Sequence, residues 1–318
     1  IYMNFEYKIF DTHSHYDDDA FNEDREAVLE QIKNDGVIGI LNCACSKTSL
    51  KTTNELTLKH DFIYGALGIH PSDANDYNED VKNEIIKLVN ENKKILAIGE
   101  IGLDYYWDEN PERDIQKKVF REQMKLAEEL NLPVVIHDRD AHGDTLEIMK
   151  EFPNVRGTVH CFSGSLEFAK ECVKLGYYIG ITGVVTFKNA RKICEVVEGI
   201  PLERLLVETD CPYMAPAPNR GKRNKSDYIR YIIEKIAEIK GISSKEVNLA
   251  VNDNFYNLIQ KTKRHYLFLF KLILKMYFIK LKIHFIKWRV GNLTKARIVY
   301  IIQWSLLPEE VKCRWLKI

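Results

Sequence analysis

The sequence has no Cys-X-X-Cys pair, although it contains seven cysteines. An odd number of scattered cysteines indicates reduced thiols in a cytosolic setting and argues against a disulfide framework. The chain also lacks an opening cationic segment followed by an apolar run, as a secretory leader would have. We therefore expect a cytoplasmic protein, with the nucleus as an alternative.

The formal net charge is zero, because 46 Lys and Arg residues balance 46 Asp and Glu residues. The charges are unevenly distributed along the chain: residues 1–260 carry 32 basic and 44 acidic residues, whereas residues 261–318 carry 14 basic and 2 acidic residues. The acidic body argues against tight, sequence-independent coating of duplex nucleic acid, which needs many phosphate contacts. A phosphate-bearing substrate would need a local positive site.

The C-terminal segment lacks acidic residues between Asp253 and Glu309. We expect residues 1–262 to form the main domain and residues 263–318 a divergent basic, hydrophobic tail. The longest uncharged apolar stretch of residues 265–290, Tyr266 to Phe270, is far shorter than the roughly 20 residues of a membrane span. Binding to a membrane surface is one interpretation. We favour translated non-coding sequence or a change of reading frame, because the tail is rich in residues with AT-rich codons. No obligate protein partner is evident.

Apolar runs alternate with helical patterns over the first 260 residues. The runs are rich in Val and Ile and lack strict alternation, as strands of a parallel sheet buried on both faces do. Eight strands are expected at 7–13, 37–44, 62–70, 95–103, 133–139, 157–163, 177–185 and 204–210. Helices are expected at 24–35, 112–131, 226–241 and 243–259, the last with Ser243 or Ser244 as N-cap. The count favours a (β/α)8 barrel, that is, a TIM barrel, over an open doubly wound sheet.

Ionisable side chains stand at the ends of most predicted strands. His13 and His15 are two residues apart, so a strand would present both on one face. The others on later strands are His70, Glu100, His137, His160 and Asp210. Because the C-terminal strand ends of a barrel meet on one face, where barrel enzymes have their active sites, we expect these groups to converge. Together they predict a metal shell with more ligands than one cation needs.

Taken singly, each of these residues has a simpler interpretation. Glu100 lies between glycines and fits a solvated turn, Asp210 fits a helix cap, and His160 fits a core histidine. His70 precedes Pro71 and fits a residue that orders a turn. Their coincidence at successive strand ends favours the metal site.

The ligand types narrow the choice of cation. Imidazoles with a bridging carboxylate suit Zn²⁺, Mn²⁺, Ni²⁺ or Fe²⁺, and mixed nitrogen and oxygen sites also hold Mg²⁺. Two cations sharing one carboxylate lie about 3.5–4 Å apart and make a bound water more acidic. We expect two divalent cations per subunit (Mg²⁺, Zn²⁺ or Mn²⁺), with Asp210 both a ligand and the base that receives the proton.

The order of the motifs resembles one known family. The stretches are FDTHSHYD, GALGIHP, IGEIGLDYY, VIHDRDA, VHCFSG, LLVETDCPYMAP and RGKRNKS. They are similar, over residues 8 to about 260, to the TatD family of metal-dependent deoxyribonucleases. The resemblance implies a TIM-barrel metallohydrolase that cuts phosphodiester bonds in DNA, often as an exonuclease. It also implies one metal held by His13, His15, Glu100 and Asp210, and a second held by Glu100, His137 and His160, with Glu100 bridging.

Candidate substrate-binding residues lie beside the predicted metals. A basic cluster after the eighth strand contains Arg220, Lys222 and Arg223, and Arg139 is close to His137. On an acidic body these cations are candidates for holding phosphates, although most charge runs are only solvated. The aromatic residues at 105–107 fit either base stacking or packing under a loop.

The sequence thus predicts a deoxyribonuclease acting on DNA ends or short single strands through a metal-activated water, with Asp210 and Glu100 as catalytic residues. Related barrels use the same kind of metal pair on amides and lactones, so a two-metal amidohydrolase or lactonase acting on a small molecule is the alternative. A third hypothesis is a non-catalytic nucleic-acid or membrane module that acts through the tail, which the complete ligand set makes the weakest.

Overall fold

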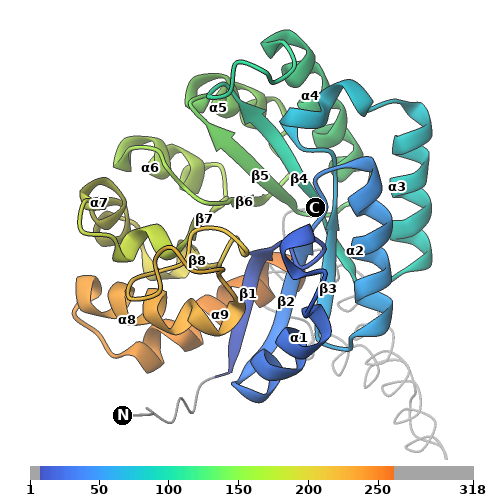
Figure 1. Cartoon of the computed structure of the whole chain (residues 1–318). Helices are drawn as coiled ribbons and strands as arrows, with labels where there is room; N and C mark the ends of the chain where they lie inside the picture. Colours follow the sequence, from blue (N-terminus) through green and yellow to red (C-terminus); the bar gives the residue numbers. More distant parts are fainter. Residues whose placement is uncertain (1–7, 261–318) are drawn as a thin grey trace, which may run out of the picture. The chain divides into compact units, whose positions relative to one another are not determined.

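Eight parallel strands form the centre of the fold. A computed structural model describes residues 8–260. The strands pair in chain order, each parallel to the next (Figure 1). They are β1 Ile9–Ser14, β2 Val37–Cys43, β3 Ile63–Leu67, β4 Ile95–Asp104, β5 Val134–Arg139, β6 Gly157–Val159, β7 Tyr178–Ile181 and β8 Leu205–Val207.

The first and last strands meet at a seam that nearly closes the sheet. The Asp210 N–H donates to the His13 carbonyl at 3.0 Å, and the His15 N–H donates to the Cys211 carbonyl at 2.8 Å. The Thr12 hydroxyl adds a bond to the Val207 carbonyl at 3.0 Å. These contacts confirm the predicted (β/α)8 barrel and exclude the open sheet.

Helices follow the strands and surround them on the outside (Figure 1). The α-helices are α1 Arg25–Asn34, α2 Lys47–Lys59, α3 Glu79–Glu91, α4 Arg113–Leu130, α5 His142–Glu151, α6 Leu166–Lys174, α7 Arg191–Gly199, α8 Ile229–Lys240 and α9 Ser244–Gln260. The 3-10 helices are η1 Asp19–Phe21, η2 Pro71–Asp76, η3 Gly183–Thr186, η4 Leu202–Arg204 and η5 Ser226–Tyr228. Ser243 is the N-cap of α9: its hydroxyl accepts from the Glu246 N–H, and the Glu246 carboxylate accepts from the Ser243 N–H.

Two apolar layers hold the barrel together. The larger lies between strands and helices, and alternate strand residues face it. The smaller contains Leu41, Val135 and Leu206, together with Phe255 and Leu258 of α9. The last helix thus packs its buried aromatic side chain against residues of several strands and helps to fix their spacing.

The predicted tail and the boundary after residue 262 lie outside the described residues. Within residues 8–260, no helix combines the length and the apolar character that crossing a membrane requires.

Candidate metal centre

The predicted ligands come from five strands and the loops that follow them. His13, Glu100 and His137 lie within β1, β4 and β5. His160 comes directly after β6, and Asp210 follows β8 by three residues. Strands β6 and β8 are shorter than predicted, so these last two side chains start from loops. All lie on the C-terminal side of the barrel, as a TIM barrel requires of its active site.

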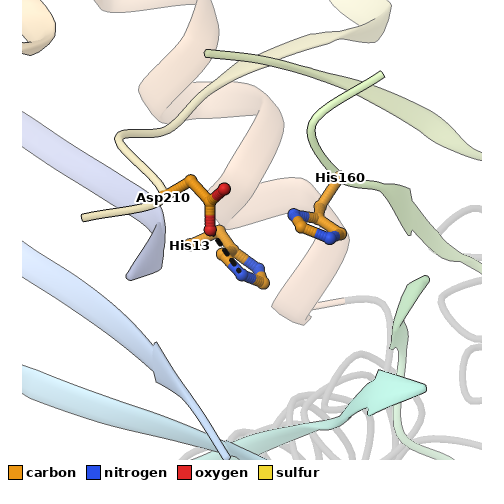
Figure 2. Close-up of side chains that lie close together, drawn as sticks. All are labelled: His13, His160 and Asp210. Atoms are coloured by element: carbon orange, nitrogen blue, oxygen red, sulfur yellow. Dashed lines mark ion pairs between the residues drawn. The ribbon is translucent and has the colours of Figure 1, made fainter. Parts of the chain in front are cut away.

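One cluster gathers four ligand atoms. His13 Nε2 and His15 Nε2 are 3.0 Å apart. Each lies 3.4–3.5 Å from Glu100 Oε2 and from Asp210 Oδ1. Ligands on a tetrahedral cation with bonds of about 2.1 Å are separated by roughly 3.4 Å. Figure 2 shows Asp210 directed at His13, with His160 beside them. The four atoms thus have the spacing of a shell around one cation.

A second cluster uses the other oxygen of the same glutamate. Glu100 Oε1 lies 2.6 Å from His160 Nε2 and 2.9 Å from His137 Nδ1, and the two ring nitrogens are 3.2 Å apart. The rings of His13 and His160 stack with centroids 3.9 Å apart, which brings the clusters side by side. Glu100 therefore connects both.

Irregular backbone places these ligands. The register of β1 against β2 shifts between Asp11 and Ser14, and that of β4 against β5 shifts between Ile98 and Ile101, around Glu100. Such irregularities redirect side chains and are common beside active sites. Asp210 has a φ of 57°, a left-handed conformation that a short polar side chain tolerates.

A glycine allows β4 and β5 to approach beside His137. Gly102 has a φ of 144°, and a Cβ there would lie 2.0 Å from the His137 carbonyl oxygen. Glycine is the residue that fits both conditions. The spacing of the two ligand-bearing strands thus depends on it.

Hydrogen bonds fix the histidine rings. His15 Nδ1 donates to the Cys43 carbonyl at 2.9 Å, which leaves the Nε2 lone pair directed at the first cluster. His137 Nε2 donates to Asp104 Oδ2 at 3.0 Å, which directs Nδ1 at Glu100. Asp104 is held in turn by the Tyr106 N–H at 3.0 Å on its other oxygen. Both rings are therefore oriented before any cation binds.

The charge states also suit cation binding. Burial lowers the pKa of His13 to about 4, so this imidazole is neutral and can ligate. Burial would raise the pKa of Glu100, but His160 and His13 outweigh it and hold the pKa well below its usual range. Burial would likewise raise the pKa of Asp210, but the neighbouring imidazoles of His15 and His13 outweigh it, and the pKa is lowered. Two ionised carboxylates and a neutral imidazole are the forms that bind metals. Burial would lower the pKa of His137, but Asp104 and Glu100 outweigh it and raise this pKa to about 9, so a cation bound by His137 would displace a proton.

The donor set fits divalent cations. Within residues 8–260, the buried Nδ1 atoms of His13 and His160 make no hydrogen bond, and the nearest carboxylate oxygen to His160 Nδ1 is Glu208 Oε1 at 3.8 Å. The Nε2 atoms of both rings face carboxylates and other imidazoles. A cation between them would satisfy nitrogens and oxygens together. Mixed sets of this kind bind Zn²⁺, Mn²⁺, Ni²⁺ or Fe²⁺, and also Mg²⁺.

Some residues of the centre were not predicted from the sequence. Asp104 is the last residue of β4, so the rule of strand ends could have found it. Cys45 Sγ lies 3.3 Å from Glu100 Oε2, and buried Glu208 accepts from the Cys161 N–H at 2.5 Å. His70, by contrast, was predicted to converge with these groups, and its Nε2 lies 3.7 Å from Glu100 Oε1. It also orders the turn that opens η2, where its Nδ1 accepts from the Ser72 N–H at 3.1 Å.

The predicted substrate-binding residues divide into two kinds. Arg139 lines a cavity together with His137, His160 and Asp210. Arg220 stacks on Phe187 with its guanidinium 4.4 Å from the ring centroid, and Lys222 is exposed. Arg223 instead donates two hydrogen bonds to Asp24, at 2.8 and 2.6 Å, so that its charge is matched.

Two aromatic residues stand exposed on the loop after β4. Tyr106 and Trp107 are 50% and 48% exposed, and Arg139 stacks over both rings, 4.0 and 5.4 Å from their centroids. Tyr105 is half-buried, and its hydroxyl donates to Asp144 at 2.6 Å. Tyr105 is therefore packed under the loop, whereas Tyr106 and Trp107 leave part of their ring surface exposed to solvent.

Residues 10–260 match the family model described as TatD related DNase. The chain belongs to this family. The match covers the whole barrel and both clusters, as the resemblance of the motifs predicted.

Similar proteins and structures extend the comparison. The uncharacterized metal-dependent hydrolase YabD of Bacillus subtilis is 44% identical over 254 residues, which are 79% of this chain and 99% of that protein. The crystal structure of the TatD homologue YjjV from Escherichia coli has 32% identity and a TM-score of 0.74, covering 79% of this chain and 98% of that one. The crystal structure of a TatD family hydrolase from Entamoeba histolytica has 26% sequence identity and a TM-score of 0.72. The match covers 80% of this chain and 98% of that one. The protein is a metal-dependent hydrolase of the TatD family.

Proposed function

We propose that the protein is a deoxyribonuclease that uses two divalent cations to cleave phosphodiester bonds at DNA ends or in short single strands. The observation that carries the proposal is the position of Glu100, whose two oxygens face two separate groups of imidazole nitrogens. His13, His15 and Asp210 would hold the first cation with Glu100, and His137 and His160 the second.

Cations without a carboxylate partner favour a substrate that carries phosphate: Arg139 lines the cavity beside the second cluster, and Arg220 and Lys222 follow β8 in the chain. Among residues 8–260, no carboxylate forms an ion pair with Arg139, Arg220 or Lys222. These charges can neutralise a phosphodiester, for which the fork of an arginine is well suited. A neutral amide or lactone would leave them without a counter-charge, which makes the small-molecule alternative weaker. We assign Arg223 a smaller part because Asp24 already pairs with it.

The open ring surface favours single strands or frayed ends. Tyr106 and Trp107 can stack on a base, and such stacking contributes about 1–3 kcal/mol per base without regard to sequence. Bases in an intact duplex are stacked on one another and do not offer their faces. This agrees with the acidic body, which disfavours coating of duplex DNA.

Different residues at and beside the metal centre would carry out different parts of the hydrolysis. Bound divalent cations would polarise the phosphate and make a water more acidic. Asp210 is buried and ionised, and its carboxylate can accept the proton of the attacking water. Glu100 keeps the two clusters at a fixed separation, and Arg139 balances charge that develops on the phosphate oxygens.

The test compares cleavage of end-labelled oligonucleotides by metal-free and reconstituted protein. Single-stranded and double-stranded forms are incubated with Mg²⁺, Mn²⁺ or Zn²⁺. Wild-type protein should shorten the strands only with cation present, and Glu100→Gln and His160→Ala should abolish cleavage while the fold is kept. His60→Ala, a histidine at the end of α2 and outside both clusters, is the matched control. Undiminished cleavage by either cluster variant refutes the proposal.

A further inference from the structure

A cavity of about 380 Å³ adjoins the second cluster. His137, His160 and Asp210 line it, and it extends to the start of α7. This volume is near the lower limit for small-molecule sites, so the cavity suits one small ligand and is too small for a duplex. It therefore offers space for one unit of a substrate that reacts at the clusters.

The wall of the cavity is mainly apolar. Phe162, Val184, Ile193 and Met214 contribute to it. An apolar wall stabilises a flat, weakly solvated group such as a nucleobase, and it offers nothing to a bare phosphate. The exposed Asn189 adds an amide that can donate to and accept from the edge of a base.

One cation at the cavity has no assigned role. Lys192 lines the cavity and is exposed, and no carboxylate of residues 8–260 pairs with it. Its neighbour Arg191 is paired with Glu195 at 2.9 Å. The lining carboxylate of Asp138 is engaged by His142 at 2.5 Å and by Thr145 at 3.0 Å. Lys192 thus keeps a point charge available for an anion from outside.

We propose that this cavity binds the nucleoside next to the scissile phosphate, and that Lys192 binds the following phosphate of the strand. The inference rests on the proposed function, because it assumes that the scissile phosphate lies at the two clusters. The base then lies against the apolar wall, and the second phosphate reaches the exposed ammonium group. Since the cavity has room for one nucleoside, cleavage is directed to the strand end.

Calorimetric titration of the full chain loaded with Mn²⁺ tests the inference with defined ligands. Thymidine 3′,5′-bisphosphate has one phosphate for the clusters and one for Lys192. The two thymidine monophosphates have only one phosphate each, and deoxyribose 3′,5′-bisphosphate lacks the base. The bisphosphate of thymidine should bind about tenfold more tightly than any of these, as one charged hydrogen bond or one buried base implies.

Two lysine variants isolate the second phosphate. Lys192→Met should lower the affinity for thymidine 3′,5′-bisphosphate about tenfold, to that of the better monophosphate, and leave monophosphate binding unchanged. Lys188→Met removes the same charge from an exposed position outside the cavity lining and should have no effect. Equal affinity of wild-type protein for the bisphosphate and the monophosphates overturns the inference, as do equal losses in the two variants. Ligand binding as expected without any cleavage of DNA overturns the proposed function instead.

Discussion

The carboxylate behind His137 gives the sharpest test of the second cluster. Asp104 accepts from His137 Nε2 at 3.0 Å and from the Tyr106 N–H at 3.0 Å, one bond on each oxygen. In Asp104→Asn one of these oxygens becomes an NH₂ group. If the amide oxygen stays on Tyr106, the NH₂ group faces Nε2 and favours the tautomer with a proton on Nδ1. That nitrogen could then no longer bind a cation.

In the opposite orientation, the amide NH₂ and the Tyr106 N–H face each other as two donors. One orientation therefore costs the metal-binding tautomer of His137, and the other costs a hydrogen bond. Loss of a carboxylate that orients a ligating histidine typically lowers metal affinity 10–100-fold, or about 1.4–2.7 kcal/mol. We expect this loss for the second cation, while the first cation, held by His13 and His15, binds as in the wild type.

Calorimetric titration with Mn²⁺ measures both binding steps. Asp138→Asn is the matched control, because it breaks a carboxylate–histidine pair at the next strand, with His142, which is not a ligand. Unchanged affinity for both cations in Asp104→Asn would refute the orienting role, and so would the same loss in the control.

Three further predictions concern the barrel and its cations. Gly102→Ala would bring a Cβ to 2.0 Å from the His137 carbonyl oxygen, so we expect a lower melting temperature together with loss of the second cation, measured by thermal unfolding and titration. Phe255→Ala should lower the free energy of unfolding by about 3–5 kcal/mol in a urea titration but leave kcat unchanged where the protein is folded, since the ring belongs to the apolar core. Removal of cations by chelation should lower stability, by about 2.7 kcal/mol relative to protein at a cation concentration of 100 Kd, and an unchanged melting temperature would show that the clusters bind no cation.

The sequence predicted the convergence of His13, His15, Glu100, His137, His160 and Asp210 because apolar runs mark the strands and a barrel brings their ends together. It did not predict where pairing stops: β6 ends at Val159, although the apolar and polar pattern continues to residue 163. The pattern of apolar and polar residues along the chain does not show where the backbone of a neighbouring strand moves out of hydrogen-bond distance.

Local sequence patterns did not reveal contacts between residues that are far apart in the chain. Arg223 was predicted to bind substrate, but its pairing with Asp24 joins positions on opposite ends of the barrel sequence. The free charge of Lys192 is equally invisible until its neighbours are seen to be paired. The roles of all these residues in binding metal and DNA stay predictions for the experiments above.

The seam between β1 and β8 gives the first cation a second use. His13 and His15 lie on one side of it and Asp210 on the other, nearly two hundred residues later in the chain. A cation bound there would link the first strand of the barrel to the last and would offset part of the entropy lost in closing so long a loop. During synthesis, this link can form only after the ribosome has released the last strand. An interrupted chain would therefore have neither a closed barrel nor a complete first cluster.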